Sequence, residues 1–395
     1  MTINTHCSDV LIVGAGITGI ASAVALAEKG VTVTVVERYS PAAMASGWTL
    51  AGVRQSGRDP AELALAKRAV ELWQTLDIQL GSPTGYRQSG NLRLARNEEE
   101  AKVIRQLVET QRQAGLDIEL LDSADLQRRM PALSNTLCCA SLCPSDGQAD
   151  PLATSNAYRI AAERLGVRFL TTTSVRRINI ETGRFHSLDT SAGKLQASIC
   201  ILATGIQTND LLQPLTLPLP IEWALVSVIQ SEPLPALLTQ VIGVANADLA
   251  LRQQADGRLR MTNGAEFTNA KLVEKAGLPR VPITPASIKA TKARVAQVLP
   301  AASSASIARS WGGLLDMTPD GLPIIDRVPG VEGLIVAAGF SGHGFGIGPA
   351  VGETIAELAT QKTTRLPLSA FAFDRFEVKV RSKNQQPESK PELHG

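Results

Sequence analysis

The chain has 395 residues, of which 44% are hydrophobic, 19% charged and 4% aromatic, and its formal net charge is +2. This composition is typical of a globular protein and excludes a largely disordered or fibrous chain. The balanced charge and the few aromatic residues argue against nucleic-acid binding, which needs a concentrated basic face or stacking platforms.

The cysteines and the apolar runs predict the compartment. An odd number of cysteines without a regular framework indicates a reducing, cytoplasmic environment. The start of the chain is polar and no apolar run approaches about 18 residues, so we expect neither a signal peptide nor a transmembrane segment. Cys138, Cys139 and Cys143 form no C-x-x-C pair and have no fourth ligand at metal spacing, so no metal site is expected.

The first predicted unit is a strand, a glycine-rich turn, a helix and a second strand. Residues 9–13 are rich in branched apolar side chains, residues 14–19 are Gly-Ala-Gly-Ile-Thr-Gly, and the alanine-rich helix that follows ends at Gly30. The three glycines of the turn permit a tight bend, the approach of a pyrophosphate and close helix packing. Glu37 ends the second strand, where a carboxylate suits a ribose 2′-hydroxyl and disfavours a 2′-phosphate. The unit therefore predicts a dinucleotide site that is not for NADP.

Three further segments extend this pattern in chain order. Residues 45–54 contain glycine and little charge, which predicts a loop. Residues 198–205 form an apolar strand that ends in Ala-Thr-Gly. Residues 334–338 form another strand, which leads into a glycine-rich turn and a helix expected from about residue 350 to 360. This last strand, turn and helix start is again a geometry that binds anions.

With these segments in place, the sequence resembles the D-amino-acid-oxidase-like superfamily of FAD-dependent oxidoreductases, which includes glycine oxidase, sarcosine oxidase and D-amino acid dehydrogenase. Within it, the chain is most similar to the β-type catalytic subunits of heteromeric dehydrogenases acting on proline, hydroxyproline, opines or sarcosine. The resemblance runs from residue 8 to about residue 362 and rests on the first unit with Glu37 and on residues 51–56, 200–205, 311–325 and 339–352.

The resemblance implies an α/β fold, with a Rossmann-like FAD-binding domain of the glutathione-reductase type and a second, smaller antiparallel-sheet substrate domain. We expect the FAD-binding domain to comprise residues 1–80, 145–210 and 310–362. The two intervening segments, 81–144 and 211–309, are expected to form the substrate domain. The polar tail, residues 378–395, is expected to be disordered.

The resemblance also implies a set of residues that hold FAD. The ADP half would be held by Gly14, Gly16, Ile17, Thr18, Gly19, Glu37 and Arg38. Ser46 and Gly47 would lie by the phosphates, Val175 would meet the adenine, and the site would also be lined by Ala203, Thr204 and Gly205. The pyrimidine edge of the flavin would be flanked by Gly342, His343, Gly344, Phe345 and Gly346. A helix N-terminus there would stabilise the negative charge of reduced flavin.

Two residues are candidates for substrate chemistry. Oxidation of an amino acid by flavin mainly requires positioning, exclusion of water and a clamp for the substrate carboxylate, ideally an arginine. Arg54 matches a carboxylate-binding arginine of sarcosine-oxidase-like relatives, and the alternative is an arginine paired locally on the surface. Glycine-oxidase-like members carry an arginine where this chain has Leu315, so Arg252 or another arginine is an alternative clamp. His343 either contacts flavin, tunes substrate protonation or is structural.

The sequence therefore predicts an FAD-dependent oxidoreductase acting on CH–NH or CH–NH2 groups. It would dehydrogenate a small amino acid or secondary amine, of the proline, hydroxyproline, opine, sarcosine or D-amino acid type, to an imine. The electrons would pass to another subunit that carries an iron–sulfur or flavin centre. Two alternatives stay open: a stand-alone amino acid oxidase that produces hydrogen peroxide, and a flavin-holding assembly subunit of a larger complex.

Overall fold

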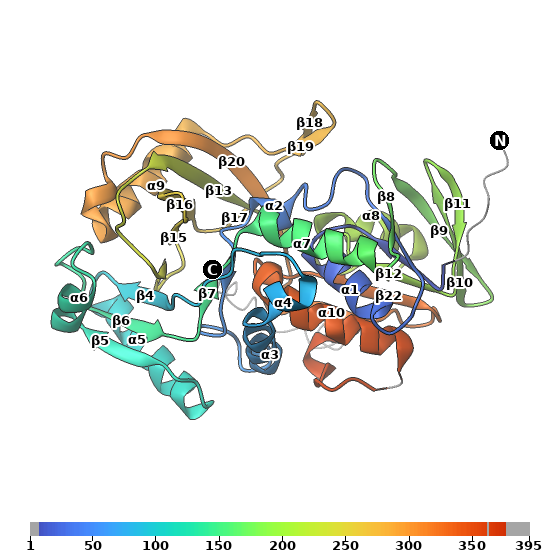
Figure 1. Cartoon of the computed structure of the whole chain (residues 1–395), viewed down its shortest axis with the longest axis horizontal. Helices are drawn as coiled ribbons and strands as arrows, with labels where there is room; N and C mark the ends of the chain where they lie inside the picture. Colours follow the sequence, from blue (N-terminus) through green and yellow to red (C-terminus); the bar gives the residue numbers. More distant parts are fainter. Residues whose placement is uncertain (1–7, 362, 377–395) are drawn as a thin grey trace, which may run out of the picture.

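The computed structural model of the chain describes residues 8–361 and 363–376, and two sheet-based regions lie side by side in it (Figure 1). The tail that the sequence predicts to be disordered, residues 378–395, lies outside the described residues. In the described part, no helix is long and apolar enough to cross a membrane.

The first region is built on a six-stranded sheet. Its strands follow the order β21 (Ile324–Arg327), β22 (Leu334–Ala338), β12 (Ile199–Leu202), β1 (Val10–Val13), β2 (Val33–Val36) and β8 (Arg168–Leu170). Neighbouring strands are parallel except at the edge, where β21 is antiparallel to β22. Every residue of β1, β2 and β22 is buried, which explains why these segments are almost entirely apolar.

Helices cover this sheet: α1 (Ile17–Ala27), α3 (Leu63–Trp73), α4 (Leu76–Leu80), α7 (Pro151–Arg164) and α10 (Gly344–Thr360). The last helix begins six residues before its predicted start, although Gly346, Gly348 and Pro349 are poor helix formers. Tertiary packing explains the difference. A Cβ on Gly348 would lie 2.6 Å from Ile17 Cγ1, so the missing side chain lets α10 pack directly on α1.

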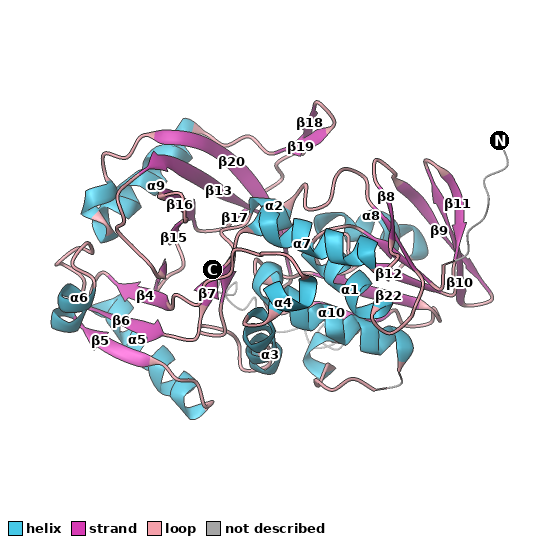
Figure 2. Cartoon of the chain, viewed as in Figure 1, coloured by secondary structure: helices cyan, strands magenta, loops and turns pink. Residues whose placement is uncertain are grey.

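The second region is a nine-stranded sheet, prominent among the strands of Figure 2. Its order is β17 (Glu266–Phe267), β13 (Glu222–Pro233), β16 (Arg258–Asn263), β15 (Leu249–Gln253), β14 (Val241–Val244), β4 (Asn91–Ala95), β6 (Cys139–Cys143) and β5 (Glu119–Asp122), and β20 (Ile307–Met317) also pairs with β13. Its pairings are antiparallel apart from that of β14 with β4. The helices on this sheet are α5 (Glu98–Gln113), α6 (Ser123–Arg129) and α9 (Pro285–Val298).

Smaller elements join the two regions or lie at their rims. Strand β3 (Gly52–Val53) pairs with β7 (Gly147–Gln148) between them. A three-stranded sheet is formed by β9 (Val175–Glu181), β10 (Arg184–Thr190) and β11 (Gly193–Gln196), and a hairpin by β18 (Val273–Lys275) and β19 (Leu278–Arg280). The short helices are α2 (Ala45–Trp48) and α8 (Thr208–Leu212), with 3-10 turns at Gly205–Gln207, Gln213–Leu215, Pro300–Ala302 and Ser369–Phe371. The segment 45–54, predicted as a loop, thus contains α2 and β3.

Each region has its own apolar core. One cluster fills the space between the six-stranded sheet and its helices, and includes Ile12, Ile20 and Trp73. Another lies between the nine-stranded sheet and α9, and includes Leu251 and Val295. This arrangement accords with the predicted α/β fold that carries a second sheet. The residue boundaries of the two domains stay a prediction, and β20 crosses the expected boundary at residue 310 because it pairs with β13.

Candidate active site

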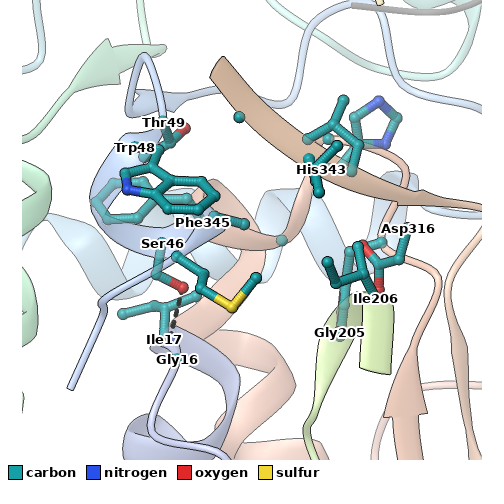
Figure 3. A pocket seen from close by; sticks show the side chains of 18 of the residues that line it. Gly16, Ile17, Ser46, Trp48, Thr49, Gly205, Ile206, Asp316, His343 and Phe345 are labelled. Carbon is teal, nitrogen blue, oxygen red and sulfur yellow. Dashed lines mark hydrogen bonds between the residues drawn. The ribbon is translucent and has the colours of Figure 1, made fainter. Parts of the chain in front are cut away.

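A cavity extends from the glycine-rich turn after β1 to the nine-stranded sheet, and both regions contribute to its walls. Figure 3 shows Ser46, Trp48 and Phe345 on one side, with Gly205 and Asp316 on the other. Every site residue predicted from the sequence lines this cavity except Gly19 and Gly47. Side chains and turns far apart in the sequence therefore meet in one place.

The turn at Gly14 is tightly packed and has little room for side chains. Gly14 has a φ of +102°, and a Cβ there would lie 2.3 Å from the carbonyl oxygen of Ala203 at the end of β12. A Cβ on Gly19 would lie 2.0 Å from the carbonyl oxygen of Gly14. Gly19 thus allows α1 to start directly behind the turn. The N-terminus of α1, with Gly16, Ile17 and Thr18, consequently faces the cavity.

Ser46 joins the next segment to the N-terminus of α1. Its Oγ accepts a hydrogen bond of 2.9 Å from the backbone N–H of Ile17, drawn in Figure 3. Gly47 packs against the backbone behind this contact, since a Cβ there would lie 2.3 Å from the carbonyl oxygen of Ala42. Gly47 therefore does not line the cavity itself, but its missing side chain lets the segment that carries Ser46 pack closely against Ala42.

Glu37 ties the end of β2 to the glycine-rich turn. Its carboxylate accepts hydrogen bonds from the backbone N–H groups of Ala15 (2.7 Å) and Tyr39 (2.8 Å). Burial raises the pKa of Glu37, and these two hydrogen bonds oppose that effect. The backbone N–H of Thr173 donates to the Glu37 carbonyl oxygen at 2.9 Å, which brings Val175 to the same wall.

The start of α10 forms another wall. Gly342 has a φ of +86°, and the five residues 342–346 all line the cavity. A Cβ on Gly346 would lie 2.9 Å from the carbonyl oxygen of Gly52, so the helix start fits closely against β3. The Trp73 indole N–H donates to the Gly346 carbonyl oxygen at 2.7 Å. The N-termini of α1 and α10 both open onto the cavity.

Three buried or half-buried arginines line the part of the cavity nearer the nine-stranded sheet: Arg54, Arg58 and Arg93. Arg54 Nη1 donates to the Ser56 carbonyl oxygen at 2.7 Å. Burial holds the pKa of Arg54 well below its usual range, and repulsion from Arg58 and Arg93 lowers it further than Asp146 and Glu62 raise it. The surroundings of Arg54 are therefore electropositive, which favours an anion.

Asp146 supports this arginine from behind. It is fully buried and accepts hydrogen bonds from the Gln55 N–H (2.8 Å), the Ser56 N–H (3.3 Å) and the Ser56 hydroxyl. These contacts hold the segment whose carbonyl oxygen receives Arg54. The sequence reasoning missed Asp146, because it lies 90 residues from Ser56 in a turn without a recognisable motif.

His343 meets a second carboxylate that the sequence reasoning missed. Its Nδ1 lies 3.0 Å from Glu62 Oε2, and the two side chains are 8% and 0% exposed. Burial by itself would raise the pKa of Glu62, but His343 and Arg58 outweigh burial and lower it to about 2. Burial lowers the pKa of His343, and Arg58 adds to this effect. The only signal for Glu62 in the sequence is that it is an acidic residue just before the segment that forms α3.

Asp316 on β20 is a third buried carboxylate at the cavity. It accepts a hydrogen bond of 2.6 Å from the Gly339 N–H, in the turn that precedes α10. Burial raises the pKa of Asp316 to about 6, against the backbone hydrogen bonds of Gly339 and Phe340. Asp316 thus couples the second sheet to the turn that positions α10.

The structure also places the alternative clamp residues. Arg252 lies outside the cavity lining and donates through Nη1 to Gln148 Oε1 at 2.7 Å. Leu315 does line the cavity. Of the residues that could have formed a cysteine cluster, Cys139 and Cys143 are buried in β6. Among residues 8–361 and 363–376, no group of His, Cys, Asp and Glu is arranged to hold a metal ion.

This arrangement fits FAD. Glycines stand where the backbone must approach a pyrophosphate closely, and two helix N-termini offer N–H groups to anionic parts of the cofactor. The family model described as FAD dependent oxidoreductase (DAO) matches residues 9–358. The chain belongs to this family. FAD is therefore its cofactor, and the family acts on amino acids and amines, as the sequence predicted.

Relatives and solved structures agree with the family. The chain is 27% identical to the beta subunit of sarcosine oxidase from Rhizobium meliloti, over 98% of this chain and 92% of the relative. It is 29% identical to the glycine oxidase of Geobacillus kaustophilus, over 95% and 99%. The structure is similar to that of L-proline dehydrogenase from P. horikoshii, with a TM-score of 0.85, 28% identity and coverage of 94% and 98%. These likenesses confirm the predicted fold class of the FAD-dependent enzyme.

Proposed function

We propose that this FAD-dependent oxidoreductase dehydrogenates a small amino acid or secondary amine, of the proline, hydroxyproline, opine, sarcosine or D-amino acid type, to an imine. The observation that carries the proposal is the continuity of the cavity. The N-termini of α1 and α10 and the arginine cluster line one and the same cavity. A substrate carboxylate bound by these arginines would keep the neighbouring carbon in the same cavity as the cofactor.

Each of the two predicted catalytic residues has a role in this proposal. When bound, FAD supplies a hydride acceptor, flavin N5, for the carbon that carries the amine. Arg54 would bind the substrate carboxylate, since its present acceptor is the neutral carbonyl oxygen of Ser56 and its surroundings are electropositive. His343 would act on the substrate amine. The walls formed by Trp48 and Phe345 would exclude water.

We also propose that the electrons leave the flavin through a partner protein that carries an iron–sulfur or flavin centre. This is supported by two relatives from Rhizobium meliloti whose names describe them as parts of larger enzymes. One is the beta subunit of sarcosine oxidase, and the other is an opine oxidase subunit that is 25% identical over 85% of this chain. A cytoplasmic location accords with this assignment and stays a prediction.

Anaerobic mixing tests the proposal. The purified flavoprotein is mixed with proline, hydroxyproline, glycine, sarcosine, D-amino acids and opines in turn, and flavin absorbance is followed before and after air is admitted. Bleaching that persists in air supports a dehydrogenase that awaits its partner. Rapid recovery in air together with hydrogen peroxide would show a stand-alone oxidase instead. If none of these compounds bleaches the flavin, the proposed substrate class is wrong.

A further inference from the structure

We propose that Glu62 is a positioning residue that holds His343 in the tautomer protonated at Nδ1, so that its Nε2 is the atom that accepts a proton from the substrate ammonium. The inference rests on the proposed function for the identity of the proton donor. The tautomer itself is a property of this chain, and it can be measured without turnover.

The geometry behind the proposal is a contact between two helix starts. Glu62 immediately precedes α3, His343 immediately precedes α10, and the two helices pack on each other. The residues are 281 positions apart, yet Nδ1 and Oε2 lie 3.0 Å apart. Glu62 is completely buried although it carries a carboxylate, and its partner lines the cavity. A carboxylate is rarely buried so deeply unless it is paired or has a role.

The charge states determine which nitrogen carries the hydrogen. A carboxylate with a pKa of about 2 is ionised at neutral pH and can only accept hydrogen bonds. Nδ1 of His343 must therefore donate. Because burial and Arg58 lower the pKa of His343, its imidazole is neutral at neutral pH, and a neutral ring protonated at Nδ1 has its lone pair on Nε2.

The negative charge of Glu62 also stabilises the protonated form of His343. Among the described residues, Arg54 and Arg58 act against an imidazolium at this position, and Glu62 favours it. In the proposed step, the N–H bond of the substrate ammonium breaks and a bond to Nε2 forms. The substrate is left as a neutral amine, with its electron pair on nitrogen, and His343 becomes an imidazolium paired with Glu62.

The first test is 15N NMR of the histidine-labelled, FAD-loaded protein. The chain has four histidines, and His343→Gln identifies the signal of His343 by its loss. We expect the Nδ1–H tautomer in the native protein. The variant Glu62→Met, which has a side chain of similar size without an acceptor, should convert His343 to the Nε2–H form. A native His343 protonated at Nε2 would overturn the proposal, whether or not the proposed substrate class is correct.

The second test is the rate of anaerobic flavin reduction as a function of pH. Glu62→Gln keeps the shape of the side chain but removes its charge, so the pKa of His343 should fall and reduction should slow by about 100-fold. The acid limb of the pH profile should move to lower pH. The matched control is Glu357→Gln, since Glu357 is a buried carboxylate of α10 that pairs with Arg365 outside the cavity.

Equal rates and pH profiles for the two Gln variants would contradict the role of Glu62. A slowing in Glu62→Gln alone, with retained FAD and an unchanged melting temperature, would support it. If the native protein is not reduced by any compound tested, the proposed function fails, and the NMR measurement still decides the tautomer.

Discussion

The two ends of the cavity differ in the atoms that line them: backbone atoms at the glycine-rich turn and charged side chains at the arginine cluster. At the glycine-rich turn, the closest contacts are made by backbone atoms, and Gly14 and Gly19 are needed because a side chain there would collide with the carbonyl oxygen of Ala203 or of Gly14. At the arginine cluster, the walls include the arginine side chains of β4 and of the segment after β3, together with His343 at the start of α10. The glycine spacing that a backbone-lined site requires is visible in the local sequence, whereas a site lined by charged side chains requires the assembled fold.

The two ends also differ in the groups that stabilise their buried charges. Near the turn, the buried carboxylate of Glu37 is satisfied by backbone N–H groups. Near Arg54, guanidinium groups and carboxylates influence one another, so that removal of one changes the protonation of the rest. Substitutions at the first end should thus act on the cofactor, and those at the second on the substrate.

The largest effect is expected from Gly14→Ala. The new Cβ would overlap the Ala203 carbonyl oxygen in a backbone with a φ of +102°, so unfolding free energy should fall by about 3 kcal/mol and the flavin should be lost. Urea unfolding and the flavin-to-protein absorbance ratio measure both. In the control Gly30→Ala, φ is also positive but no atom lies within 4 Å of the new Cβ. This control should cost about 1 kcal/mol and keep FAD.

Arg54→Ala tests the substrate end. Loss of the clamp should weaken substrate binding, so the substrate Kd obtained from flavin reduction should rise by about 100-fold, while the FAD content stays unchanged. Stopped-flow reduction at a series of substrate concentrations gives this constant. Arg252→Lys should leave it unchanged, because Arg252 lies outside the cavity lining. A raised Kd in Arg252→Lys, together with a native Kd in Arg54→Ala, would show that Arg252 and not Arg54 binds the substrate carboxylate.

Asp316→Asn should have a smaller effect that depends on pH. The folded pKa of Asp316 is raised by burial to about 6, from an ordinary value of 3.8. The folded protein therefore holds this proton more tightly than the unfolded chain, and stability is lost as pH rises from about 4 to 6. Asparagine avoids the buried charge, so the variant should gain about 2 kcal/mol at pH 8 and nothing at pH 4. Urea unfolding at the two pH values measures the difference; an equal gain at both would contradict it.

The smallest effect is expected from Glu37→Gln. The amide can replace one of the two hydrogen bonds from Ala15 and Tyr39, but it lacks the charge that strengthens them and that suits a ribose hydroxyl. The FAD dissociation constant should rise by about tenfold. Titration of the apoprotein with FAD measures it. The substrate Kd of the reloaded enzyme should not change, and a change there would show that the two ends are coupled.

Local sequence was sufficient where a motif has one structural solution. The spacing of Gly14, Gly16 and Gly19 between two apolar strands admits only a strand, turn and helix, and the structure has them. The expected start of α10 near residue 350 was wrong, because the glycines and Pro349 that argue against a helix are the residues that let it pack on α1. Helix propensity is a weak preference that such packing overrides.

The sequence by itself therefore determined the dinucleotide unit, because that unit depends on residues within one short segment, and it identified the family from several short motifs along the chain. The tertiary structure alone decided that Asp146 supports the Arg54 segment and that Glu62 pairs with His343. These contacts join residues 90 and 281 positions apart. No spacing or periodicity in the sequence predicts such a contact, because the contact forms only when the two sheets and the helices between them have packed.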